Sequence, residues 1–168
     1  MIARTLLALA LAGSASHAAN ALVNGDFESG LDAWRVWGGI PSNDAHKGQA
    51  SCEISSASLA WAGIDQVLKV PAGMGHMDLS GWLRSDTIRQ GPEDWNKGRL
   101  GVDFLDARDS LVGGYQMVAG QVRGKLPWTY AQRNYAIPTG ALKAKIICAL
   151  ANARGTLHCD DLAVEFSP

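Results

Sequence analysis

Hydrophobic and polar residues alternate along most of the chain in short runs, separated by glycine, proline and small polar residues. Successive side chains on a strand point to opposite faces, so this period of two indicates half-buried β-strands. No stretch of helical length carries a convincing apolar stripe at helical spacing. Such strands with turn residues between them predict an all-β, two-sheet antiparallel β-sandwich. The predicted strands are 22–28, 31–37, 50–54, 64–70, 77–84, 100–105, 111–118, 128–137, 145–150 and 157–166.

The first residues differ from the rest of the chain. One arginine precedes the apolar run 6–13, and small residues follow it. These parts are typical of a secretory signal peptide, cleaved after Ala18 or Ala21. The run is too short to cross a bilayer, which takes about 20 apolar residues. We therefore expect a signal peptide at 1–18, a single domain at 19–168, and a secreted or periplasmic mature protein with no membrane span.

The composition narrows the classes of function. The chain has 168 residues, and 15 Lys and Arg against 16 Asp and Glu give a net charge of -1. Nucleic-acid binders and polybasic membrane-surface proteins carry a basic excess, so we expect neither nucleic acid nor a membrane surface as partner. With 47% hydrophobic and 18% charged residues, the chain is too apolar to remain disordered.

Motifs of serine hydrolases, zinc proteases and P-loop enzymes are missing from the sequence. Asp103, Asp106 and Asp109 lie close together, and a pair of carboxylates is what most glycosidases use. The segment that begins at Asp106 is typical of a hairpin turn, however, where aspartate bonds local main-chain groups. We therefore do not expect an enzyme.

The chain has three cysteines, and export would permit disulfides. Cys148 and Cys159 flank the turn-like sequence Asn-Ala-Arg-Gly at 152–155, and a hairpin centred there would place them directly opposite each other. Opposed cross-strand residues are close enough for a disulfide after slight adjustment. We therefore predict a Cys148–Cys159 bond. Cys52 alternates with Ile54 and is expected to be a small core residue with a free thiol.

Several segments match, in order, the strands of a known family. The opening Asn-Gly-Asp-Phe-Glu at 24–28 is its start, Ser-Gly-Trp-Leu-Arg at 80–84 its central strand, and Cys-Asp-Asp-Leu at 159–162 its closing strand. Shorter matches lie at 48–51 and 64–67. The chain thus resembles the carbohydrate-binding modules of the family four, nine and twenty-two type. These modules are galactose-binding-like jelly rolls, so the resemblance implies a two-sheet antiparallel jelly-roll β-sandwich.

The resemblance also implies a structural calcium ion between the two ends of the domain. Calcium takes six to eight oxygen ligands. The chain departs from the family at the turn before the strand 50–54, where Lys47 stands near a usual carboxylate position and its ammonium is an alternative to the ion. A further alternative is that the aspartates bond main-chain N–H groups. The implied ligands are the carbonyl oxygens of Asp26 and Ala50 and the carboxylates of Glu28 and Asp160.

Candidate ligand-binding residues follow from the alternation and from the resemblance. Apolar positions on 77–84 and 100–105 are expected to face the core, so the residues between them face outward. In similar modules the loop before 64–67 carries an aromatic residue that stacks on a sugar. Aromatic, charged and amide side chains together suit sugars, because sugar rings have apolar faces and polar hydroxyls. The candidates are Trp61, Trp82, Arg84, Trp95, Asp103 and Gln116.

The resemblance implies non-catalytic binding of an oligo- or polysaccharide by an exported domain. Two alternatives stay open: an envelope structural or interaction domain that binds no sugar, and a small carbohydrate-active hydrolase or lyase. Trp34 and Trp128 are expected in the core. Exposed Trp61 and Trp95 side by side would favour sugar binding, and burial of both would favour a structural domain. A cleft with two facing carboxylates would favour an enzyme.

Overall fold

The computed structural model describes residues 19–168, apart from the side chain of Gln116; the predicted signal peptide lies outside the described residues. Within this part of the chain every regular element is a strand. No helix there is long and apolar enough to cross a membrane. The strands are β1 (Arg35–Val36), β2 (Gly39–Ser42), β3 (Ser51–Lys69), β4 (His76–Arg89), β5 (Gly98–Leu105), β6 (Leu111–Val122), β7 (Gly124–Ala136) and β8 (Lys143–Ser167).

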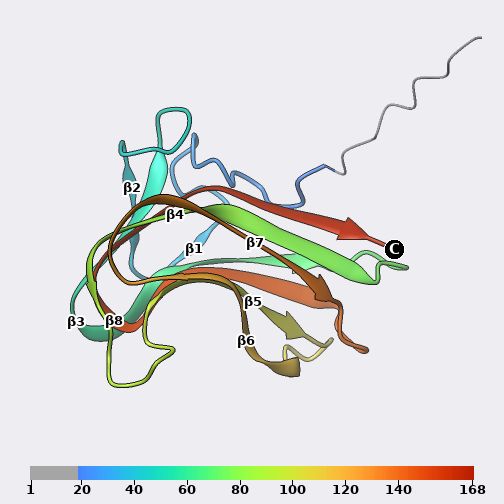
Figure 1. The fold of residues 1–168 in the computed structure, drawn as a ribbon. Coiled ribbons are helices and arrows are strands. Elements are labelled where there is room, and N and C mark those ends of the chain that lie inside the picture. Colours follow the sequence, from blue (N-terminus) through green and yellow to red (C-terminus); the bar gives the residue numbers. More distant parts are fainter. Residues whose placement is uncertain (1–18) are drawn as a thin grey trace, which may run out of the picture.

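These strands form two antiparallel layers (Figure 1). In the first layer, β2 pairs with the first half of β3, and the order continues through the second half of β8 to β4 and β7. In the second layer, β1 pairs with the second half of β3, and the order continues through the first half of β8 to β5 and β6. The predicted all-β antiparallel sandwich is therefore confirmed.

β3 and β8 each run through both layers, so four of the predicted short strands are halves of two long ones. The predicted hairpin at 152–155 is wrong, because β8 continues to pair with β3 on both sides of that segment. Asn152 and Gly155 have φ angles of 48° and 122°, a left-handed backbone that Asn and Gly tolerate. These residues bend the strand from one layer into the other without ending it.

The predicted Cys148–Cys159 disulfide is wrong for the same reason. Cys148 pairs with Ile64 in the second layer, whereas Cys159 pairs with Cys52 and Leu83 in the first layer. All three cysteines are free, fully buried thiols in this structure. The placement of Cys52 in the core agrees with its alternation in the sequence.

The opening segment forms turns in place of the predicted strand 22–28. The Asn24 side-chain amide donates to the carbonyl oxygens of Gly30 and Asp32, both at 3.1 Å, and holds the turns together. Phe27 is fully buried and its ring lies 5.5 Å from that of Trp34, which is 7% exposed. The core position predicted for Trp34 is confirmed. The Asn-Gly-Asp-Phe-Glu motif thus supplies both the turn and its apolar anchor.

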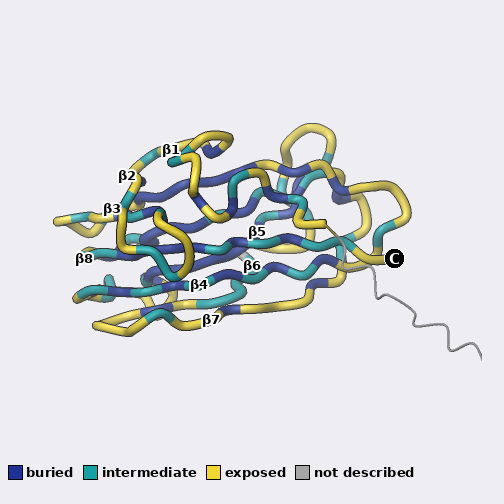
Figure 2. The backbone as a smooth tube through the Cα atoms, turned by 90° about the horizontal axis from the view of Figure 1, so that it is seen from above, coloured by how far each residue is buried: buried dark blue, intermediate teal, exposed yellow. Residues whose placement is uncertain are grey.

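The core lies between the two layers, and the edge strand β7 is mostly exposed (Figure 2). Gly81 of the first layer faces this core so closely that a Cβ there would lie 2.3 Å from Leu162 and 3.2 Å from Leu100. Burial of apolar side chains from both layers is the main favourable term in folding. The largest fully buried side chains are Phe27, Phe104, Ile54, Ile64, Met77, Leu79, Leu83, Leu100, Ile146, Leu150, Leu157 and Leu162.

Candidate functional site

Two tryptophans form an exposed pair at one end of the second layer. Trp61 lies on β3 and Trp95 on the loop between β4 and β5, and their ring centroids are 6.0 Å apart at an interplanar angle of 35°. Their exposed fractions are 41% and 45%. The structure therefore brings together the two loop tryptophans selected from the sequence. The segment that holds Trp61 was predicted as a loop, but it continues β3 across register shifts between Ser56 and Ala62.

A groove begins beside Trp61 and runs over the outer face of the second layer. One hollow of ≈ 230 Å³ lies next to a second of ≈ 470 Å³, since both are lined by Arg35, Asp65 and Lys145. Predicted Asp103 lines the first hollow, and Lys145 lies 3.4 Å from its carboxylate. We refer to the surface lined by Arg35, Trp37, Trp61, Asp65, Asp103 and Lys145 as the groove.

One wall of the groove is built around Asp65, which is 2% exposed. Its carboxylate accepts hydrogen bonds from the Arg35 guanidinium, the shortest at 2.7 Å, and from the Trp37 indole N–H at 2.7 Å. Gly63 allows this arrangement, because a Cβ there would lie 2.9 Å from the Trp37 ring and 2.5 Å from the Cys148 carbonyl oxygen. The sequence analysis missed Arg35, Trp37 and Asp65. The signal for Arg35 and Trp37 was the run 31–37 directly after the family's opening motif, and the signal for Asp65 was the matched segment 64–67.

The loop that carries Trp95 is anchored by Asn96, which is fully buried. The Asn96 side-chain oxygen accepts the Glu93 N–H at 2.9 Å and the Asn152 amide at 3.5 Å. The Ala151 N–H donates to the Lys97 carbonyl oxygen at 2.9 Å. These contacts attach the loop to the bend of β8. A bend that looked like a hairpin turn in the sequence thus helps to position Trp95.

Two of the other predicted ligand residues do not join the groove. Trp82 and Arg84 point outward, as predicted, but from β4 in the first layer. The His46 ring stacks on Trp82 with centroids 3.8 Å apart at 14°. Gln116 is on β6, and its side chain lies outside the described part of the chain.

Trp128 is a correction to the sequence analysis, which expected it in the core. It is half-buried and lies on the outer face of the first layer, with its ring centroid 5.9 Å from that of His46 and 6.2 Å from that of His158. The register explains the difference. Trp82 pairs with Tyr130 on β7, and Trp128 is two residues from Tyr130, so all three side chains share the outer face.

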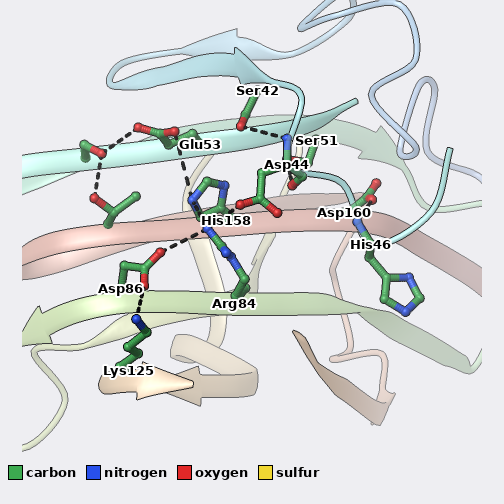
Figure 3. Close-up of polar contacts among 12 residues, drawn as sticks. Ser42, Asp44, His46, Ser51, Glu53, Arg84, Asp86, Lys125, His158 and Asp160 are labelled. Carbon is green, nitrogen blue, oxygen red and sulfur yellow. Dashed lines mark hydrogen bonds and ion pairs between the residues drawn. The ribbon is translucent and has the colours of Figure 1, made fainter. Parts of the chain in front are cut away.

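Arg84 is held in a network of polar side chains on the same face (Figure 3). Its guanidinium lies 2.6 Å from the Asp44 carboxylate and 3.0 Å from that of Asp86, and it donates to His158 Nε2 at 2.9 Å. Burial and then Arg84 lower the pKa of His158 below its ordinary value of 6.5, while carboxylates including that of Glu53 oppose the shift. His158 Nδ1 is buried without a hydrogen-bond partner. The network therefore holds His158 in its neutral form.

Replacing His158 with glutamine should flatten the dependence of stability on pH. An unfolded histidine binds its proton near pH 6.5, whereas folded His158 resists protonation until the pH is lower. The wild-type free energy of unfolding is therefore fully present above pH 6.5 and falls below it, by up to about 1.4 kcal/mol per unit of lowered pKa. Urea unfolding between about pH 7.5 and 5.5 compares the two proteins. Equal slopes would contradict the role given to His158.

The two carboxylates among the implied calcium ligands already accept main-chain hydrogen bonds. Glu28 accepts the N–H groups of Gln49 and Ala50 at 2.7 and 3.1 Å. Asp160, which is fully buried, accepts the N–H groups of His46 and Lys47 at 2.8 and 3.1 Å. Among residues 19–168 no group of three or more His, Cys, Asp or Glu is arranged to hold a metal ion. We therefore expect these N–H groups, in place of an ion, to hold the two carboxylates.

Adding calcium to chelator-treated protein should therefore leave the melting temperature unchanged. Main-chain N–H groups already hydrogen-bond to the Glu28 and Asp160 carboxylates. An ion that binds the folded and unfolded states equally does not change the unfolding equilibrium. Thermal melts with calcium and with chelator provide the measurement. A higher melting temperature in calcium would support the ion implied by the resemblance.

Comparison with known proteins agrees with this fold. The family model described as "Carbohydrate binding domain" (CBM_4_9) matches residues 19–153, so the chain belongs to this family. None of the curated proteins is similar enough to match.

Solved structures show the same fold at low sequence identity. A family 16 carbohydrate-binding module has a TM-score of 0.62 and 19% identity, covering 87% of this chain and 99% of its own. TmCBM61 in complex with beta-1,4-galactotriose has a TM-score of 0.60 and 20% identity, covering 89% and 99%. The bacteriophage CBA120 tailspike protein 4 domain has a TM-score of 0.72 and 16% identity, and the match covers 88% of this chain but only 21% of the tailspike chain.

Proposed function

We propose that this protein is an exported, non-catalytic carbohydrate-binding domain whose sugar stacks on Trp61 and Trp95. The observation that carries the proposal is the exposed pair of indole rings beside an open groove that is lined in part by charged side chains. Membership of a family of carbohydrate-binding domains supports the class of ligand. An oligo- or polysaccharide is the expected partner.

The groove offers both kinds of contact that a sugar needs. The indole faces present apolar surface to the C–H face of a sugar ring. Beyond them, Arg35 is well exposed and donates to Asp65 through only part of its guanidinium, leaving N–H donors for hydroxyl groups. The Asp103–Lys145 pair adds a carboxylate and an ammonium on the groove's other side. A saccharide of several units would extend from the tryptophan pair along these side chains.

Binding without catalysis is supported by how the groove carboxylates are held. A glycosidase uses two carboxyl groups across the scissile bond, one of which gives up a proton. Asp65 is bonded to Arg35 and Trp37, and Asp103 is paired with Lys145. Both carboxylates are thus held by cationic groups, an arrangement suited to fixing hydroxyl groups rather than to proton transfer.

The test is a paired measurement on Trp61→Ala and Trp95→Ala, namely glycan titration and thermal melting of the same preparation. The proposal predicts weaker binding and an unchanged melting temperature, because both rings lie at the surface. A large drop in the melting temperature would instead show that Trp61 and Trp95 stabilise the fold.

A further inference from the structure

The three cysteines lie together in the core but are not equivalent. Cys52 on β3 and Cys159 on β8 are direct Cα partners on neighbouring antiparallel strands of the first layer. Cys148 pairs with Ile64 and Leu100 in the second layer. Each cysteine is fully buried, and the Cys159 thiol interacts with the thiols of both others. Cys159 therefore has one neighbour in its own layer and one across the core.

Geometry separates these two neighbours. Directly opposed residues in an antiparallel pair have Cβ atoms about 4.5–5.5 Å apart, and a disulfide needs about 3.5–4.5 Å. A small strand movement closes that difference between Cys52 and Cys159, and rotation about χ1 then brings the two sulfur atoms together. Facing sheets pack about 10 Å apart, whereas disulfide-bonded Cα atoms lie within about 6.8 Å. The thiols of Cys159 and Cys148 are in contact across the core, and a bond between them would therefore draw the two layers together.

We propose that Cys52 and Cys159 are a disulfide-forming pair, and that Cys148 stays a free thiol. The reaction is thiol–disulfide exchange with a small-molecule or protein disulfide as oxidant. One cysteine thiolate attacks the oxidant and forms a mixed disulfide, and the second cysteine displaces the remaining thiolate. The two cysteines lose two protons and two electrons in total, and the oxidant is reduced to two thiols.

The exchange takes place while the chain folds, before the core closes. Thiolates are the attacking species, and burial, together with contacts to Cys148 and Cys52, raises the pKa of the Cys159 thiol well above its ordinary value. No oxidant reaches these fully buried sulfur atoms in the folded domain. The bond joins residues far apart in the sequence, so it restricts the unfolded chain strongly.

The experiment refolds the reduced, denatured full chain in a buffer of oxidised and reduced glutathione, blocks free thiols, and maps the linked peptides without reductant. We expect one free thiol per chain, at Cys148, and a Cys52–Cys159 link. Cys148→Ala is the matched control and should keep the link with no free thiol. Reduced protein that is already folded should keep all three thiols in the same buffer.

Two results would overturn the proposal. Three free thiols after refolding would show that the pair does not close, and a link that includes Cys148 would show that the layers do not control the pairing. Thermal melting adds a second readout. Wild type and Cys148→Ala should melt at a higher temperature after oxidative refolding than after refolding in reductant, whereas Cys52→Ala should melt at the same temperature after both.

Discussion

Replacing Trp61 with alanine should weaken glycan binding at least about tenfold, a loss of about 1.4 kcal/mol or more. A buried aromatic anchor in an interface commonly contributes about 2 kcal/mol. Trp61 makes the ring pair with Trp95 and lines the groove, so the substitution removes one of the two proposed stacking surfaces. Trp95→Ala should have an effect in the same direction, measured by titration with the same glycan.

The melting temperature should barely change in both variants, because the two rings are 41% and 45% exposed. Leu59→Ala is a matched control, since Leu59 is an exposed apolar residue on the same strand, 49% exposed. It should change neither binding nor stability. If both tryptophan variants bound the glycan as tightly as wild type does, the ligand would bind outside the groove.

Replacing Phe27 with alanine should lower the free energy of unfolding by about 3–5 kcal/mol, because truncation of a fully buried aromatic residue leaves a cavity. Phe27 is 0% exposed and packs on Trp34 beneath the turns of the opening motif. For a domain of this size the melting temperature should fall by roughly 6–20 °C. Chemical and thermal unfolding measure the loss.

Val23→Ala is the control for that measurement, because Val23 lies in the same segment and is 61% exposed. It should change the free energy of unfolding by less than about 0.5 kcal/mol. If Phe27→Ala were as mild as Val23→Ala, the opening segment would not be part of the domain's cooperative core.

The alternation of residues predicted the strands well where each strand has one buried face. The strand 77–84 is an example, since Leu79 and Leu83 are buried and Trp82 and Arg84 point outward as predicted. The pattern failed at 152–155, where Asn and Gly mark a left-handed backbone. Local sequence shows that such a backbone is needed, but the same residues serve a hairpin and a bend within one long strand. Which of the two forms depends on pairing with β3, which is distant in sequence.

The candidate site was predicted in part. Trp61 and Trp95 were selected as separate loop residues, and only the fold places them side by side. Trp82 and Arg84 were grouped with Asp103 because all three face outward. A sandwich has two outer faces, however, and Trp82 and Arg84 lie on the first layer whereas Asp103 lies on the second. Asn96 and Asp65 were missed, since their roles depend on burial and on partners that the sequence pattern does not show.

The most direct test of sugar binding in the groove is a glycan array probed with residues 19–168 of the wild type, of the Trp61→Ala/Trp95→Ala double variant and of Tyr130→Ala. Tyr130 is a control of similar exposure, 49%, on the first layer. We expect wild type and Tyr130→Ala to bind the same oligo- or polysaccharides and the double variant to lose them. Binding of no glycan by wild type, or equal binding by the double variant, would contradict the proposed function.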